Sequence, residues 1–371
     1  MSGFVVKGWC PDAWHPMAAG DGLIVRVRPR LGRLDRAQAA GLCEAARTFG
    51  NGLIDMTSRA NLQIRGVRES AWHSLVERLV QLGLTDADPT LEARRSILAA
   101  PQWQPGDDTV RIARDLGARL DELPVLPGKT GFAIDAGNVP ELLGEAGDFR
   151  IERGAHGGLI LRADGRATGA AVPHGEEVDR LIALAHWFAT SGGAAAGRMA
   201  RHRAELPGWA RGSIAPAAPA PRLAPGAFSR GAAWGLPFGQ IGAETLAALV
   251  ADPKVPALRL TPWRIVLAEG ALPAAAEGLI DDPADPLLRA DACPGAPLCP
   301  QASVETRALA RRIAPHVQGR LHVSGCAKHC AAPRHAGVTL TGRDGRYDLS
   351  GHGPERLALG QDQVLAHFGA S

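Results

Sequence analysis

The chain has 371 residues, too many for one ordinary hydrophobic core, so two or three packed units are expected. Its 41 basic and 38 acidic residues nearly cancel, which speaks against binding of nucleic acid or a membrane surface through net charge. No signal peptide and no apolar stretch of membrane-spanning length is recognisable, so a cytoplasmic location is expected. In that compartment six cysteines favour metal ligands or reduced thiols over disulfides.

The predicted elements occur twice along the chain, once on each side of a Pro/Ala-rich linker at residues 214–225. Each copy predicts a strand, a Gly turn, a helix, a strand and a second helix, and Asp35 and Ser70 are the expected N-caps of the first copy. A longer segment with a further helix follows in each copy. The segments that match are 31–42 with 238–249, 53–66 with 257–270, 70–84 with 272–280, 109–120 with 304–313, and 126–135 with 321–330.

Four of the cysteines lie near the C-terminus in two pairs, spaced C-x5-C and C-x3-C. Gly and Pro flank both pairs (CPGAPLCP and SGCAKHCAAP), as expected of loops that bring thiolates together on an iron–sulfur cluster. Zinc competes, although structural zinc prefers tighter spacings, and four unrelated thiols are the remaining alternative. Cys43 is expected in a helix core, and Cys10 in a loop is left unassigned. The predicted 4Fe-4S ligands are Cys293, Cys299, Cys326 and Cys330.

Basic and polar side chains alternate with apolar ones in two strands of the first copy. Residues two apart in a strand share a face, so Arg26 and Arg28 point away from Val25 and Val27. A solvated sheet face would explain this, but the second copy is largely apolar at the matching positions, which are Ala233, Gly235, Trp263, Ile265, Leu267 and Glu269. Guanidinium groups bind carboxylates through paired hydrogen bonds, which suits a polycarboxylate ligand. The residues predicted to bind it are Arg26, Arg28, Arg59, Asn61, Gln63 and Arg65.

The pattern C-x5-C followed by S-G-C-x3-C, with an upstream T-S-R-A-N-L-Q strand, resembles the sulfite/nitrite reductase superfamily over essentially the whole chain. Its members hold a 4Fe-4S cluster beside a tetrapyrrole. The resemblance implies an α+β, internally duplicated fold, with ferredoxin-like half-domains and two α/β cluster-type domains related by pseudo-twofold symmetry. The expected extents are 1–87 for half-domain 1, 88–205 for a cysteine-free cluster-type domain, 206–228 for the linker, 229–284 for half-domain 2 and 285–371 for the 4Fe-4S-binding domain.

Details of the motifs distinguish branches of this superfamily. In the reductases of this superfamily, arginines and two lysines that follow a Leu-Pro turn surround sirohaem and the bound anion. Lys129 in LPGKTGF matches the first lysine, and is predicted to bind a tetrapyrrole carboxylate, but Gly131 stands where the second is expected. The G-C-P-N-x-C of reductases reads G-C-A-K-H-C here. With the opening CPDAWHPMAAGDGLIVRVRPRLG, these details are more similar to the precorrin-3B synthase family.

That resemblance implies a monooxygenase of aerobic cobalamin biosynthesis. Precorrin-3A would lie where reductases hold sirohaem, and would be hydroxylated at C20 with O2 and closed to a γ-lactone. It also implies a 4Fe-4S cluster, a non-haem iron and electrons from NADH. No G-x-G-x-x-G unit followed by an acidic residue is present, so a reductase or ferredoxin is expected to deliver those electrons.

Some roles stay open at this stage. Catalytic residues are not identified, and none of the 12 histidines stands in a pattern that marks it as an iron ligand. A sirohaem-dependent sulfite or nitrite reductase and a non-catalytic electron-transfer protein remain the alternatives. A single Tyr and near-neutral charge speak against a nucleic-acid partner, and no membrane partner is expected.

Overall fold

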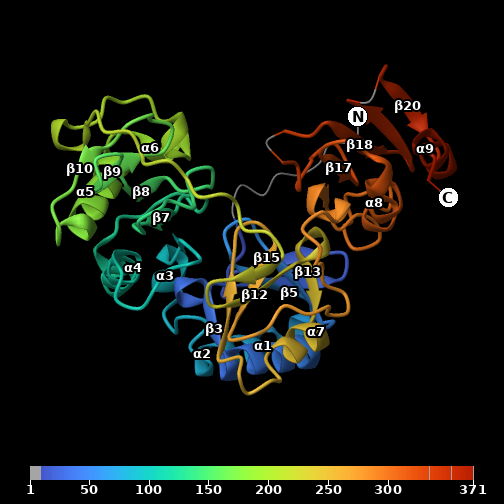
Figure 1. Cartoon of the computed structure of the whole chain (residues 1–371), viewed down its shortest axis with the longest axis horizontal. Coiled ribbons are helices and arrows are strands. Elements are labelled where there is room, and N and C mark those ends of the chain that lie inside the picture. The colour runs from blue at the N-terminus through green and yellow to red at the C-terminus, as the bar shows by residue number, and fades with distance from the viewer. Residues whose placement is uncertain (1–9, 334, 352, 371) are drawn as a thin grey trace.

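The computed structural model describes residues 10–333, 335–351 and 353–370. The strands of this part of the chain form four five-stranded sheets. Two sheets and three helices make one broad layer, and each of the other two sheets belongs to a separate module above it (Figure 1). Within the described residues, no helix is long and apolar enough to cross a membrane.

The broad layer holds two antiparallel sheets that exchange their outer strands. A strand of the second copy, β13, pairs with β4 of the first, and β3 of the first copy pairs with β14 of the second. Neither copy therefore completes its sheet alone. The first sheet runs in the order β1 (Met17–Ala19), β2 (Gly22–Val27), β5 (Leu62–Val67), β4 (Leu53–Met56), β13 (Gln240–Gly242), and the second in the order β11 (Gly226–Phe228), β12 (Gly231–Gly235), β15 (Ile265–Glu269), β14 (Ala257–Leu260), β3 (Arg33–Asp35).

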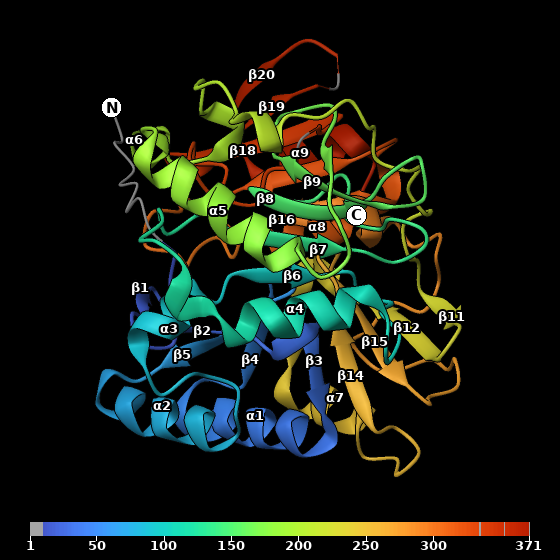
Figure 2. The same cartoon turned by 90° about the vertical axis from the view of Figure 1, so that its left-hand side faces the viewer.

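Helices α1 (Arg36–Phe49), α2 (Trp72–Gln81) and α7 (Ala243–Leu249) cover the side of this layer that faces away from the modules (Figure 2). Apolar side chains of both copies pack there in one shared core. As predicted, Asp35 caps α1. Its side chain accepts a hydrogen bond from the backbone N–H of Gln38, and the side chain of Gln38 accepts one from the backbone N–H of Asp35, which together form a capping box. The alternation of the strands sends their apolar side chains to this core and their polar ones to the opposite face.

Two of the predicted helix features are wrong. Ser70 does not cap α2, which begins at Trp72 after a 3-10 turn and has no side-chain cap. Residues 272–280 form no helix, because Pro273 interrupts the segment and Gly278 turns it with a φ of +77°. The segment instead ends in a bridge between Gly235 and Ile280.

The two modules share one topology. In each, three neighbouring strands run parallel and two more continue the sheet antiparallel. The first module has the order β6 (Ile97–Ala99), β7 (Phe132–Asp135), β8 (Phe149–Arg153), β9 (Leu159–Ala163), β10 (Ala170–Ala171), and the second β16 (Ala290–Ala292), β17 (Leu321–Ser324), β18 (Val338–Arg343), β19 (Arg346–Ser350), β20 (Arg356–Leu359). Their helices, with α3 leading into the first module, are α3 (Pro89–Arg94), α4 (Asp108–Ala118), α5 (Glu177–Thr190), α6 (Gly193–Ala196), α8 (Arg307–Ile313) and α9 (Gln361–Phe368). The fold is thus α+β and duplicated, as predicted.

Backbone details repeat between the copies as well. Ala60 and Arg264 both adopt the left-handed conformation, with φ of +53° and +60°, just before β5 and β15. The hydroxyl of Thr57 accepts a hydrogen bond from the backbone N–H of Asn61, and Thr261 does the same for Ile265. The predicted alignment of these two segments therefore matches their three-dimensional equivalence.

Candidate functional site: a basic sheet face beside converging cysteine loops

The arginine face, as we call it, is the side of the first sheet opposite its helices, and it carries Arg26, Arg28, Asn61, Gln63 and Arg65. One row crosses the sheet along the register of the strands: Arg26 lies opposite Gln63, and Gln63 opposite Asp55. The Nη2 of Arg26 donates to Oε1 of Gln63 at 2.7 Å. At the far end of the row, Gln240 of the exchanged strand donates to Asp55 at 2.9 Å.

Two arginines of this face already have carboxylate partners. Arg65, whose side chain is 2% exposed, forms ion pairs of 2.8 Å with Asp21 and 3.0 Å with Asp55. Burial alone would lower the pKa of Arg65, but these two carboxylates outweigh it and raise the pKa. Arg28 is paired with the buried Glu92. The role of Arg28 and Arg65 in ligand binding stays a prediction, and their visible role is to hold the fold together.

Arg59 lies at the edge of the arginine face and reaches the first module. Its Nη1 donates to Ser96 Oγ at 3.2 Å, and its Nη2 donates to the backbone oxygen of Lys129. The structure thus brings together two residues predicted to bind carboxylates from positions 70 apart in the chain. Burial lowers the pKa of Arg59, and the nearby Arg198 lowers it further, whereas Asp148 raises it.

A small cavity of about 10 Å³ opens beside this arginine, lined by Arg59, Asn61, Ser96, Ile97, Leu98, Gly131, Phe132 and Ala146. It is far too small for a macrocycle and takes no more than the terminal oxygens of a carboxylate arm, because a single water molecule already needs about 10–15 Å³. Guanidinium and amide donors at the wall of such a cavity suit an anionic arm.

The matching face of the second copy is closed. Ala233, Ile265 and Leu267 form a small apolar cluster there, against which Leu223 of the linker and Phe228 pack. The linker therefore covers the position that corresponds to the arginine face. This explains why only one copy keeps polar side chains on that face.

The cysteines lie in the loops that follow two neighbouring parallel strands. Cys293 directly follows β16 and Cys326 follows β17, so both loops leave the sheet at the same edge. Although Cys330 is exposed, partial desolvation raises the pKa of its thiol, which Lys328 lowers and the three other thiols raise. Cys330 is thus within electrostatic reach of the three other thiols of the predicted cluster ligands.

The shape of these loops depends on two glycines. The backbone N–H of Gly325 donates to the sulfur of Cys293 at 3.2 Å, the kind of hydrogen bond that tunes iron–sulfur centres. A Cβ on Gly325 would lie 2.5 Å from that of Ala302, and one on Gly295, where φ is +69°, would lie 2.6 Å from the hydroxyl of Thr306. The donor set and its loops fit a 4Fe-4S cluster. In the described part of the chain, no three His, Cys, Asp or Glu side chains are grouped around one point as ligands of a single metal ion.

The first module has no cysteine loop, and the segment that corresponds to that loop is not the one predicted from the sequence. The sheet order makes β7 the counterpart of β17, so Lys129 precedes its strand whereas Cys326 follows its own. The predicted equivalence of residues 126–135 and 321–330 is therefore wrong. The true counterpart of the loop that contains Cys326 begins at Ala136.

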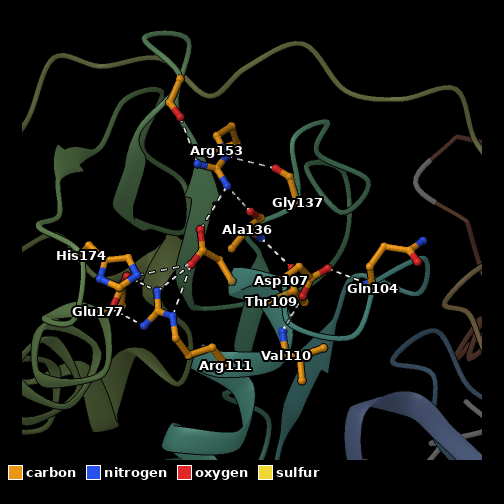
Figure 3. Close-up of polar contacts among 12 residues, drawn as sticks. Gln104, Asp107, Thr109, Val110, Arg111, Ala136, Gly137, Arg153, His174 and Glu177 are labelled. Carbon is orange, nitrogen blue, oxygen red and sulfur yellow. Dashed lines mark hydrogen bonds and ion pairs between the residues drawn. The ribbon is translucent and has the colours of Figure 1, made fainter.

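An arginine fills the corresponding place in the first module. Arg153 donates to the backbone oxygens of Gly137, at 3.1 Å, and of Ala136 (Figure 3). Its counterpart on β18 is Gly342, where a Cβ would lie 2.6 Å from the oxygen of Gly325. In the second module, the cysteine loop therefore occupies the space that the side chain of Arg153 fills in the first module.

Acidic residues neutralise the basic groups around Arg153. Asp108 forms ion pairs with Arg153 at 3.4 Å and with Arg111 at 2.8 Å, and Arg111 also binds Glu177 at 2.6 Å (Figure 3). The first module thus has an ion-pair network near the position that corresponds to the cysteine loop of the second.

Sequence reasoning missed several residues near the site. Cys10, left unassigned, lies within electrostatic reach of the guanidinium groups of Arg26 and Arg59. Ser96 and Arg307 also contact the arginine face, at Arg59 and Asp55 respectively. No periodicity or spacing marks these residues, because each reaches the face from a segment distant in sequence.

Comparisons with known proteins agree with this architecture. Residues 15–82 match the model of the nitrite/sulfite reductase ferredoxin-like half domain. A precorrin-3B synthase from a Sinorhizobium species is 31% identical over 92% of this chain and 82% of its own length. A ferredoxin–nitrite reductase from Synechococcus elongatus is 28% identical over 38% of this chain and 30% of its own length. The structure of the Mycobacterium tuberculosis NirA protein, 20% identical, superposes with a TM-score of 0.65 over 90% of this chain and 72% of its own, which supports the fold.

Replacing Arg65 by Met should lower the free energy of unfolding by about 3–5 kcal/mol, because Asp21 and Asp55 lose the cation that compensates their buried charge. Urea unfolding followed by circular dichroism measures this. The matched variant Arg59→Met removes a cation that binds a hydroxyl and a backbone oxygen, and should cost about 1 kcal/mol. Equal losses in the two variants would contradict the distinction drawn between these arginines.

Replacing Cys326 by Ser should abolish assembly of a cluster, measured as iron and acid-labile sulfide per chain after anaerobic purification. The control is Cys43→Ala, since Cys43 lies in the core of α1 and burial raises the pKa of its thiol to about 12. That variant should keep its iron and sulfide and lose about 1 kcal/mol of stability. Full iron and sulfide in the Cys326 variant would exclude it as a ligand.

Proposed function

The chain belongs to the precorrin-3B synthase family, within the wider nitrite/sulfite reductase group, and from that membership we propose that it is an oxidoreductase of cobalamin biosynthesis. The proposed reaction hydroxylates precorrin-3A at C20 with one atom of O2 and closes a γ-lactone through a ring acetate. The second oxygen atom leaves as water after two electrons, ultimately from NADH, and two protons are taken up.

The observation that favours this function over a reductase is the lack of space for a side chain at Gly131. A Cβ at this position would lie 2.7 Å from Ser96 Oγ and 3.4 Å from Nη1 of Arg59. The side chain of a second lysine of the reductase type would therefore clash with Ser96, and its Cβ would already be in contact with Arg59. The resemblance to reductases assigns such a lysine to the binding of sulfite or nitrite. In this chain, Ser96 and Arg59 occupy the space that the lysine side chain would need.

In the proposed complex, the chain's own residues bind and orient the macrocycle. Arg59 and Lys129 hold one carboxylate arm at the cavity, and Arg26, fixed by Gln63, holds another along the same face. Several fixed contacts to a ring of anions set which edge of the macrocycle faces the cysteine loops. Cys293, Cys299, Cys326 and Cys330 would hold a 4Fe-4S cluster, which supplies one-electron transfer when bound.

A sirohaem-dependent nitrite or sulfite reductase is the second candidate. The same carboxylate contacts would suit sirohaem, and the similarity to the nitrite reductase of Synechococcus elongatus favours this reading over a simple electron carrier. A protein that only transfers electrons has no use for the arginine face. In either enzyme, we propose that a separate reductase or ferredoxin supplies the electrons.

The absorption spectrum of the protein, purified without oxygen, distinguishes the two candidates. We expect a brown protein with a broad shoulder in the visible region, because an iron–sulfur cluster absorbs there and the tetrapyrrole is a substrate that dissociates. Extraction with acidified acetone should release no sirohaem. A sharp Soret band with extractable sirohaem would reject the biosynthetic function in favour of the reductase.

The arginine face can be tested separately from catalysis. Arg59→Ala should weaken the binding of uroporphyrin, which carries the same kinds of acetate and propionate arms, by about 1.5–3 kcal/mol, the value of a charged hydrogen bond. Quenching of uroporphyrin fluorescence measures the affinity. The control Arg68→Ala removes an exposed arginine that donates to the backbone of Thr48 and should leave the affinity unchanged. Equal affinities of the Arg59 variant and the parent would remove Arg59 from the binding site.

A further inference from the structure

Arg307, the first residue of α8, has a side chain that is 16% exposed and a charge that the protein compensates poorly. Its Nε and Nη1 atoms are buried and have no hydrogen-bond partner among the described residues. The carboxylate that pairs with it is Asp55, whose Oδ1 lies 3.6 Å from Nη2, too far for a hydrogen bond. A buried guanidinium in this state is costly unless another negative charge stands close to it.

Asp55 is also engaged by other groups. Its Oδ2 accepts from Arg65 at 3.0 Å, and its Oδ1 accepts from Gln240 at 2.9 Å. Arg65 and Arg264 bring further positive charge into the neighbourhood of Arg307. Asp55 therefore cannot neutralise Arg307 alone.

The remaining negative partner is a cysteine of the predicted cluster. Cys293 is the other group that favours the charged form of Arg307, while burial, the largest effect, lowers the pKa of Arg307. A hydrogen bond holds Arg307 near Cys293, because Thr306, the residue before Arg307, donates its hydroxyl hydrogen to the backbone oxygen of Cys293. Thiolate ligands and a cluster would supply the missing negative charge.

We propose that Arg307 is the counter-charge of the 4Fe-4S cluster and that it favours the reduced state of that cluster. This inference rests on the cluster in the proposed function. A cluster with four thiolates has a net charge of −2 when oxidised and −3 after it takes one electron from an external donor. A cation held in a poorly solvated position interacts more favourably with the second state than with the first. Arg307 thereby joins the cysteine loops to the arginine face through Asp55.

The experiment measures the midpoint potential of the cluster in the whole protein, by dithionite titration followed by electron paramagnetic resonance. Arg307→Gln should shift the potential to more negative values, because the added electron loses its cation. Asp55→Asn should shift it in the opposite direction, because Arg307 loses its competing carboxylate. The control Arg311→Gln removes an exposed cation of the same helix, stacked over Phe238, and should shift the potential least.

Iron and sulfide contents separate the possible failures. A parent protein without acid-labile sulfide would reject the cluster itself, and with it this role of Arg307. A parent with a full cluster and an unchanged potential in Arg307→Gln would overturn the role of Arg307 alone. If Arg307→Gln does not assemble a cluster, assembly in Arg307→Lys supports the need for a positive charge, whereas failure of both variants overturns it.

Discussion

Two short exchanged strands hold the copies of this protein in one orientation, and the candidate site depends on that. Because β13 completes the first sheet and β3 the second, the two half-domains form one layer with a shared core. Each module then grows from a fixed edge of this layer (Figure 1). The arginine face of the first copy and the module that carries the cysteine loops of the second meet across this shared layer, at Asp55 and Arg307.

The distribution of compensating charge divides the basic residues into two groups. Arg65 and Arg28 lie deepest, and the fold supplies each with a carboxylate, since an unpaired buried charge would be too costly. Arg59 and Arg26, toward the edge, bind neutral groups and keep hydrogen-bonding capacity for an anion. The arginines that stabilise the fold and those that we propose bind a ligand thus differ in burial and in partners, although they alternate along the same strands.

Each copy of the duplicated fold lacks one half of the candidate site. The second copy has closed its own version of the arginine face with apolar residues and the linker. The first has filled its version of the cysteine loops with Arg153. One candidate site remains, formed by the polar face of one copy and the loops of the other, and Arg307 pairs with Asp55 between them. A duplicated fold can specialise in this way because each half still supports the sheet of its partner.

The sequence by itself determined the features that depend on local spacing: the paired cysteines, the alternation of Arg26 and Arg28 with Val25 and Val27, the cap at Asp35 and the alignment of residues 53–66 with 257–270. These follow from strand and helix periodicity and from loop composition, which are properties of neighbouring residues. Tertiary structure alone decided which arginines are neutralised, because Asp21 lies 44 residues from Arg65 and Glu92 lies 64 from Arg28. It also decided the strand exchange, the true counterpart of the cysteine loop, and the place of Arg307 beside Cys293. Each of these depends on which distant segments meet, and that is set by packing of the whole chain.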